Sequence, residues 1–208
     1  MKILLKSTLV IMLFLSLIYA CTKEETIEDP PPAGAKYDVV SIQTNHGNMV
    51  MWLYDETPLH KANFLTLTNN DFYNGLIFHR VINDFVIQGG DPDGTGTGGP
   101  GYTIDAEFVA SLTHVYGAVG AARDNNPAKA SNGSQFYIVE NTAGTHFLDN
   151  EYTVFGIIID GLPVVSDIAS VPTNANDKPL TDVVMTKVEV LKYTAEELLS
   201  NFNFTVPQ

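Results

Sequence analysis

Hydrophobic and polar positions alternate along much of this chain, which is typical of half-buried β-strands. Val40, Ile42 and Thr44 alternate with polar neighbours, and residues 46–48 have the composition of a turn. Residues 49–54 would then form a second strand that runs back along the first. This pattern predicts a hairpin. Further short apolar runs, rich in β-branched and aromatic residues, follow at 76–78, 81–82, 85–87, 117–122, 134–139, 153–159 and 183–191.

Two segments have helical rather than strand character. Pro58 is favourable at the first position of a helix, and Leu59, Ala62 and Leu65 follow at helical spacing. Residues 162–170 predict a second, shorter helix. Many short strands with only two helices favour an antiparallel β-barrel.

The N-terminal residues predict export and anchoring rather than a folded domain. Lys2 and Lys6 open segment 1–20, which is otherwise almost continuously apolar and has the order of a signal peptide; a retained membrane anchor is the alternative. Cys21 follows directly and resembles a bacterial lipobox, which implies cleavage before it and lipid attachment; a chance cysteine is the alternative. Residues 21–35 are acidic and Pro-rich, so we expect a lipidated, extended tether in a bacterial cell envelope.

Composition excludes two classes of protein. The 208 residues carry a formal charge of −13, and removal of segment 1–20 leaves nine basic against 24 acidic residues. Such an acidic chain has no electrostatic footprint for nucleic acid. A single cysteine also excludes an intramolecular disulfide.

Other motif matches lack their context. Gly94, Gly96 and Gly99 fit a dinucleotide-loop pattern, but Pro100 stands where a helix should open, so we expect a wide loop without nucleotide. Ser134 lacks the surroundings of a hydrolase nucleophile. The histidines show no metal-ligand spacing, so no metal is expected: they are His46, His60, His79, His114 and His146.

The stretch 76–91 carries the clearest chemical signal. Arg80 lies among apolar strand residues, where an arginine is costly unless it is paired or functional. The alternative is an arginine whose stem packs on apolar surface while its head reaches water. His79 precedes it, and strand alternation directs the two to opposite faces, so we interpret His79 as structural.

Four motifs, in order, decide between these interpretations: FHRVINDFVIQGGDP, GAVGAAR, NGSQFYIV and HFLDNEYTVFGII. Together they resemble the cyclophilin-type peptidyl-prolyl cis-trans isomerases over residues 36–192. The resemblance implies a closed eight-stranded antiparallel β-barrel with a helix over each open end. Residues 193–208 lie beyond the family's usual end, as a C-terminal extension.

The resemblance also implies roles for individual residues. Arg80 matches the catalytic arginine, and Gln88 and Gln135 match glutamines that orient it and hold the substrate backbone. Ala122 and Arg123 match a strip that hydrogen-bonds the residue before proline. The remaining substrate-binding positions are Phe85, Val86, Tyr137, Phe147, Leu148 and Tyr152. No cofactor is implied.

Several of these positions depart from the common family residues. Val86 stands where many members have methionine, Tyr137 where most have phenylalanine, and Phe147 where tryptophan is frequent. Tyr152 stands where histidine is frequent, and Arg123 where asparagine is frequent. Most of these changes keep apolar volume or a donor, so they leave catalysis in place. Cyclosporin sensitivity should be lower, because a phenylalanine lacks the indole N–H donor.

Two classes of function remain open from the sequence. The first is a monomeric isomerase that accelerates X–Pro bond rotation in polypeptide substrates during folding of envelope or secreted proteins. The second is a proline-peptide binding module with little turnover, displayed on the membrane. The set of Arg80, Gln88 and Gln135 favours the isomerase.

Overall fold

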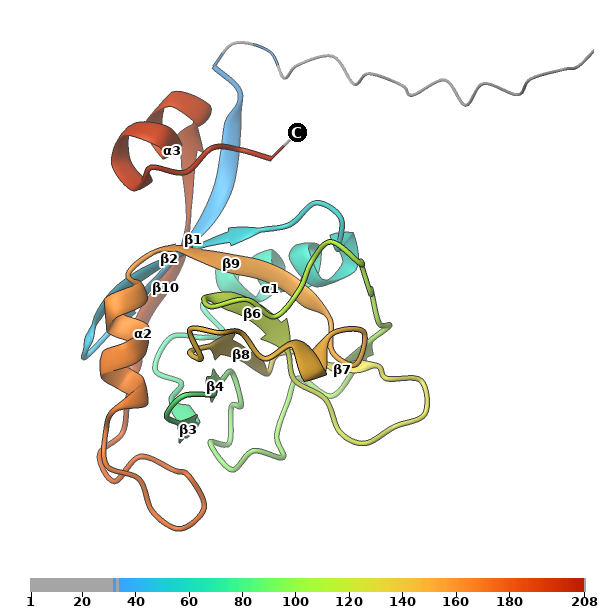
Figure 1. The fold of residues 1–208 in the computed structure, drawn as a ribbon, viewed down its shortest axis with the longest axis vertical. Helices are drawn as coiled ribbons and strands as arrows, with labels where there is room; N and C mark the ends of the chain where they lie inside the picture. The colour runs from blue at the N-terminus through green and yellow to red at the C-terminus, as the bar shows by residue number, and fades with distance from the viewer. Residues whose placement is uncertain (1–31, 33, 208) are drawn as a thin grey trace, which may run out of the picture. The chain divides into compact units, whose positions relative to one another are not determined.

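The computed structural model describes residues 32 and 34–207 (Figure 1). The predicted signal segment 1–20, Cys21 and most of the tether lie outside the described residues. Within the described part, no helix combines the length and the hydropathy needed to cross a membrane.

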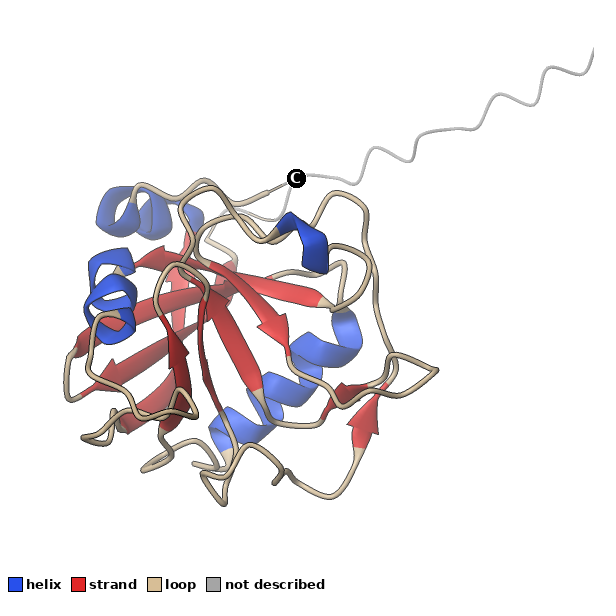
Figure 2. Cartoon of the chain, turned by 60° about the horizontal axis from the view of Figure 1, so that its bottom comes forward, coloured by secondary structure: helices blue, strands red, loops and turns tan. Residues whose placement is uncertain are grey.

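Eight of the described strands form one antiparallel sheet in the order β10-β1-β2-β9-β6-β8-β4-β3 (Figures 1 and 2). They are β1 (Lys36–Thr44), β2 (Gly47–Leu53), β3 (Phe78–Ile82), β4 (Val86–Gly89), β6 (Ala118–Ala121), β8 (Phe136–Val139), β9 (Val154–Asp160) and β10 (Met185–Thr194). β5 (Thr103–Ile104) and β7 (Ser131–Asn132) form a separate pair. The helices are α1 (Pro58–Asn69), α2 (Leu162–Ala169), α3 (Ala195–Phe202) and the 3₁₀ turn η1 (His146–Leu148).

The main sheet is an open half-barrel, so the predicted closed barrel is wrong. Between the edge strands β3 and β10 only one bridge forms, from Ile77 to Val184, and it is flanked by backbone hydrogen bonds from the Phe78 N–H to the Val183 carbonyl, at 2.9 Å, and from the Met185 N–H to the Leu76 carbonyl, at 2.8 Å. Further along β3, the Val81 N–H bonds the Asp177 carbonyl at 2.8 Å, out of register with this bridge, because Thr173 and Pro179 pair within the loop before β10. The ladder therefore ends there.

Helix α1 buries a different face from the one that the sequence predicted. His60, Phe64 and Thr68 are buried, whereas Leu59 is 52% exposed. The Glu107 carboxylate accepts the backbone N–H groups of Leu59 and His60, each at 3.0 Å, and so satisfies two free donors at the helix start. This anchor fixes the rotation that turns His60 inward.

The described chain has a third helix, α3, beyond the two that the family resemblance implies, and it belongs to the C-terminal extension. α3 begins with a capping box in which the side chains of Thr194 and Glu197 bond each other's backbone N–H groups. Leu198 is fully buried, and Phe204 packs on the Trp52 ring at 5.0 Å between centroids. The extension therefore covers an apolar patch of the sheet with a small core of its own.

Strand alternation in β4 and β8 separates the core from a second face. Ile87, Phe136 and Ile138 point into the main core, which also packs α1 and α2. Val86 and Tyr137, one position along each strand, belong to a smaller cluster with residues that follow β6 and η1. Each of these two strands thus supports the fold with one face and the candidate site with the other.

Candidate active site

A cleft of about 180 Å³ lies over the second face of β4 and β8. Its lining residues are Arg80, Phe85, Val86, Gln88, Ala122, Arg123, Tyr137, Leu148 and Tyr152. All nine are among the eleven site residues that the sequence predicted, and the other two, Gln135 and Phe147, lie beside them. Residues from four separate segments of the chain therefore meet at one place.

Arg80 projects from β3 into this cleft and is held from two sides. One terminal nitrogen, Nη1, donates to Gln88 Oε1 at 3.4 Å, and Nε lies 3.8 Å from a carboxylate oxygen of Asp177. The guanidinium carbon is 5.9 Å from the centre of the Phe85 ring. The Arg80 side chain remains 38% exposed, so a ligand in the cleft can reach it.

Asp177 is a site residue that sequence reasoning missed. It comes from the loop between α2 and β10, where its carbonyl accepts the Val81 N–H at 2.8 Å. This backbone contact places the Asp177 carboxylate beside Arg80. The loop has no periodic pattern, and nothing in its local sequence indicates a contact with β3.

Gln88 and Gln135 form a chain of hydrogen bonds that ends on Arg80. Gln135 Nε2 donates to the carbonyls of Gly96 and Gly98, at 3.2 and 2.8 Å. Its oxygen accepts from Gln88 Nε2 at 3.0 Å, which leaves Gln88 Oε1 for the Arg80 guanidinium. The amide orientations follow from this network, because each nitrogen must face an acceptor.

The glycine-rich loop after β4 supports this chain. Gly94 and Gly96 have positive φ angles of 61° and 91°, which only glycine adopts readily, whereas Gly99 does not. Buried Asp91 accepts backbone N–H groups of Asp93, Thr95 and Gly98 at 2.8–3.2 Å, in addition to that of Gly96. Burial raises the pKa of Asp91, but these backbone hydrogen bonds outweigh it and leave the pKa below its ordinary value.

Arg123 stiffens the opposite wall of the cleft. Its Nε donates to the Glu151 carbonyl at 3.0 Å, and its guanidinium carbon lies 4.5 Å from the centre of the Tyr152 ring. The Ala122 N–H is used within the fold, on the Gln135 carbonyl at 3.0 Å. The Arg123 backbone makes no hydrogen bond within residues 34–207, so it is the part of the predicted strip that can pair with a substrate.

Phe147 forms an exposed rim rather than part of the lining. It lies on η1, is 73% exposed, and stacks on Phe85 with ring centres 5.8 Å apart and planes within 15°. The pair extends the apolar surface from the cleft outward.

The sequence matches one protein family over most of the described part of the chain. The profile described as "Cyclophilin type peptidyl-prolyl cis-trans isomerase/CLD" matches residues 39–190. The chain belongs to this family. It is a peptidyl-prolyl cis-trans isomerase.

Relatives and solved structures agree with this assignment. A Staphylococcus haemolyticus protein named as a peptidyl-prolyl cis-trans isomerase is 37% identical over an alignment 181 residues long, and the match covers 73% of this chain and 90% of that protein. A bifunctional phosphatase/peptidyl-prolyl cis-trans isomerase of Streptococcus pyogenes is 40% identical over 182 residues, but this chain spans only 38% of its length. A Cryptosporidium parvum cyclophilin, crystallised in the presence of the dipeptide Ala-Pro, has a TM-score of 0.69 and 32% identity, and the match covers 74% of this chain and 98% of that one.

His79 lies outside the cleft of this cyclophilin, as strand alternation predicted. It is buried, and both ring nitrogens are without a hydrogen-bond partner among the described residues. Burial lowers the pKa of His79, so the ring is neutral near pH 7. Its position is that of a core residue beneath the glycine-rich loop.

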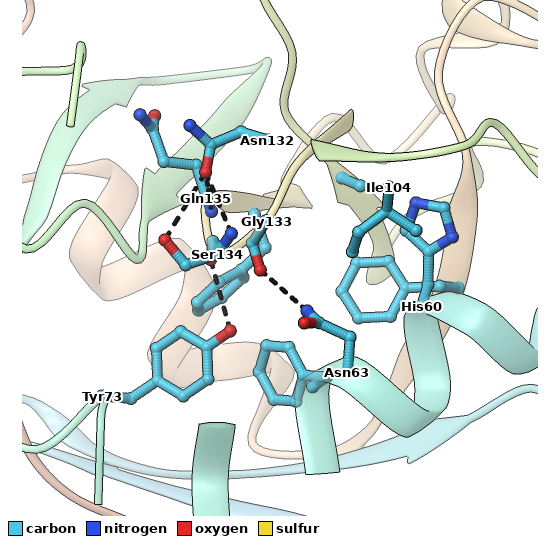
Figure 3. A pocket seen from close by; sticks show the side chains of 12 residues that line it. His60, Asn63, Tyr73, Ile104, Asn132, Gly133, Ser134 and Gln135 are labelled. Carbon is cyan, nitrogen blue, oxygen red and sulfur yellow. Dashed lines mark hydrogen bonds between the residues drawn. The ribbon is translucent and has the colours of Figure 1, made fainter. Parts of the chain in front are cut away.

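A second cavity, between α1 and the segment after β7, does not serve as the site (Figure 3). Ser131 Oγ lies 3.0 Å from His60 Nε2, and His60 Nδ1 lies 2.6 Å from Glu107, which is the hydrogen-bond order of a serine hydrolase. Ser131 is only 1% exposed, and the cavity of about 10 Å³ holds no more than one water. The three residues therefore pin two loops onto α1.

Among residues 32 and 34–207, no group of three or more His, Cys, Asp or Glu side chains has the arrangement of a metal site.

Proposed function

We propose that the cleft binds proline-containing polypeptides and that Arg80 stabilises the twisted state of the X–Pro bond. Rotation about an amide has a barrier of about 18–20 kcal/mol, and the uncatalysed step takes on the order of tens to hundreds of seconds. A turnover of about 10–1,000 s⁻¹ requires this barrier to fall by roughly 4–7 kcal/mol. No covalent bond breaks, so a cation that binds the twisted amide better than the planar one is sufficient.

The observation that carries this proposal is the fixed guanidinium of Arg80. Nη1 donates to Gln88 and Asp177 lies within ion-pair distance of Nε, while Nη2 has no partner among the described residues and can donate to a substrate. When the X–Pro amide twists, its nitrogen becomes pyramidal and the lone pair, which resonance shares with the carbonyl in the planar amide, localises on the nitrogen. A donor held beside that nitrogen then forms a hydrogen bond that the planar amide does not offer.

The apolar lining supplies the binding energy for the proline ring. Val86 and Tyr137 are almost fully buried and form the base, and Leu148 and Phe85 pack against them. These side chains exclude water from the ring of the substrate, which strengthens the interaction of Arg80 with the amide.

The test is a protease-coupled isomerisation assay on residues 22–208 with an X–Pro peptide. Arg80→Ala should lower kcat/KM at least about tenfold while circular dichroism shows an unchanged fold. Arg80→Lys should not restore activity, because an ammonium lacks the planar fork of the guanidinium. Lys192→Ala removes an exposed cation on β10 and is the matched control. A folded Arg80→Ala variant with wild-type turnover would refute the role of Arg80.

The same assay addresses the binding-module alternative. A module of that kind would bind the peptide in a titration yet accelerate its isomerisation little. We favour the enzyme, because Arg80 is oriented by two neighbours and remains open to the cleft.

We further propose that the protein acts as a lipid-anchored monomer in a bacterial envelope and assists folding of envelope or secreted proteins. The support is the order of signal segment, Cys21 and tether in the sequence. Each buried CH₂ of an acyl chain contributes about 0.8 kcal/mol, so several chains on Cys21 would hold the protein at its membrane.

A further inference from the structure

A hydrogen-bonded chain runs from the protein surface to the base of the proline cleft. Exposed His146 bonds Asp149 through its Nδ1, at 2.9 Å. Asp149 Oδ1 accepts both the backbone N–H of His114, at 2.8 Å, and its ring Nδ1, at 2.7 Å. His114 Nε2 then lies 2.8 Å from the hydroxyl of Tyr137, which lines the cleft. His114 itself is fully buried.

The partners of His114 fix its tautomer. Asp149 is an acceptor only, so the proton of the neutral ring is on Nδ1. Nε2 then carries a lone pair, and the Tyr137 hydroxyl must donate to it. Burial lowers the pKa of His114, although the Asp149 carboxylate opposes this, so the neutral ring persists near pH 7. The Tyr137 O–H therefore donates to His114 Nε2.

Apart from His114, the Tyr137 ring is held by packing contacts only. A Cβ on Gly120 would lie 2.3 Å from the Tyr137 Cζ and 2.4 Å from its hydroxyl, so the ring occupies the space that the glycine leaves free. Tyr152 touches it edge-on, with ring centres 6.0 Å apart. Packing alone leaves the end of the ring without a polar anchor, and His114 provides one.

We propose that His114, held by Asp149, is a positioning residue that fixes Tyr137 as the base of the proline cleft. This inference rests on the proposed function, since it takes the cleft over Tyr137 as the binding place of the proline ring. A tyrosine at this position needs a buried acceptor for its hydroxyl. His114 meets that need and so determines where the aromatic wall lies.

A double-mutant cycle tests the proposal on residues 22–208, with KM for an X–Pro peptide as the main readout. In His114→Asn, the side-chain NH₂ lies close to the place of His114 Nδ1 and can still donate to Asp149. The shorter side chain cannot reach the Tyr137 hydroxyl. Because it leaves a buried hydroxyl unpaired, it should raise KM by about fivefold or more, with a smaller change in kcat. Tyr137→Phe removes the hydroxyl, so in that background His114→Asn should change KM no further.

The same variants separate positioning from a purely structural role. If His114 only pinned the η1 loop, His114→Asn would raise KM equally in both backgrounds, and that result would overturn the proposal. His114→Gln, whose amide oxygen can accept near the place of Nε2, should restore part of the wild-type KM. Because Arg80→Ala tests kcat/KM independently, failure of this cycle leaves the role of Arg80 untouched.

Discussion

Asp91 offers a direct test of how the loop after β4 supports catalysis. Its Oδ2 accepts the backbone N–H groups of Thr95, Gly96 and Gly98, and its Oδ1 accepts that of Asp93. In Asp91→Asn one of these two acceptors becomes an NH₂ donor that faces backbone donors. A hydrogen bond to a charged group contributes about 1.5–3 kcal/mol, so the substitution should lower the free energy of unfolding by about 2–4 kcal/mol.

The same substitution should reduce activity through Gln135. The carbonyls of Gly96 and Gly98 hold Gln135 Nε2, and Gln135 in turn orients Gln88 toward Arg80. A loosened loop releases this chain, and a loss of about 1.4 kcal/mol at the transition state lowers kcat/KM tenfold. Urea unfolding and the protease-coupled assay measure the two effects separately.

The control for this variant lies in the same loop. Asp93 is exposed, and Asp93→Asn should change stability by no more than about 0.5 kcal/mol. Since the folded pKa of Asp91 lies below its ordinary value of 3.8, its contribution is present above that value and is lost as pH falls through the folded pKa. The acid limb of the stability curve should therefore flatten in Asp91→Asn. Equal losses in the two variants, or none in Asp91→Asn, would refute this reasoning.

Three further outcomes are expected. Leu198→Ala empties a buried position under α3 and should lower the free energy of unfolding by about 2–4 kcal/mol in urea denaturation, whereas Leu199→Ala, 52% exposed, should not. Phe147→Trp should tighten cyclosporin inhibition by about 0.5–1.5 kcal/mol in a titration, and an unchanged constant would show that the indole donor is not limiting. Cys21→Ser should block lipidation, and an intact mass from the native membrane showing unmodified Cys21 would exclude the anchor.

The sequence located the site more accurately than the architecture. All the residues that line the cleft lie within the four quoted motifs, because the resemblance to the family assigned them position by position. The closed barrel failed between β3 and β10, where the loop before β10 folds on itself and the pairing stops after one bridge. The prediction of which face of α1 is buried failed because Glu107, from a distant loop, fixes the rotation of the helix. Both errors arise from contacts between segments far apart in the chain.

The motifs contain the residues that line the cleft but not all of the residues that hold them in place. In β4, Val86 and Gln88 face the cleft while Ile87 faces the core, so one alternating stretch encodes both fold and chemistry. Asp177 and His114, in contrast, lie in loops without periodicity, and their roles depend on where folding brings those loops. The resemblance to the family predicts which side chains line such a cleft. Which groups hold those side chains in place becomes visible only from the folded chain.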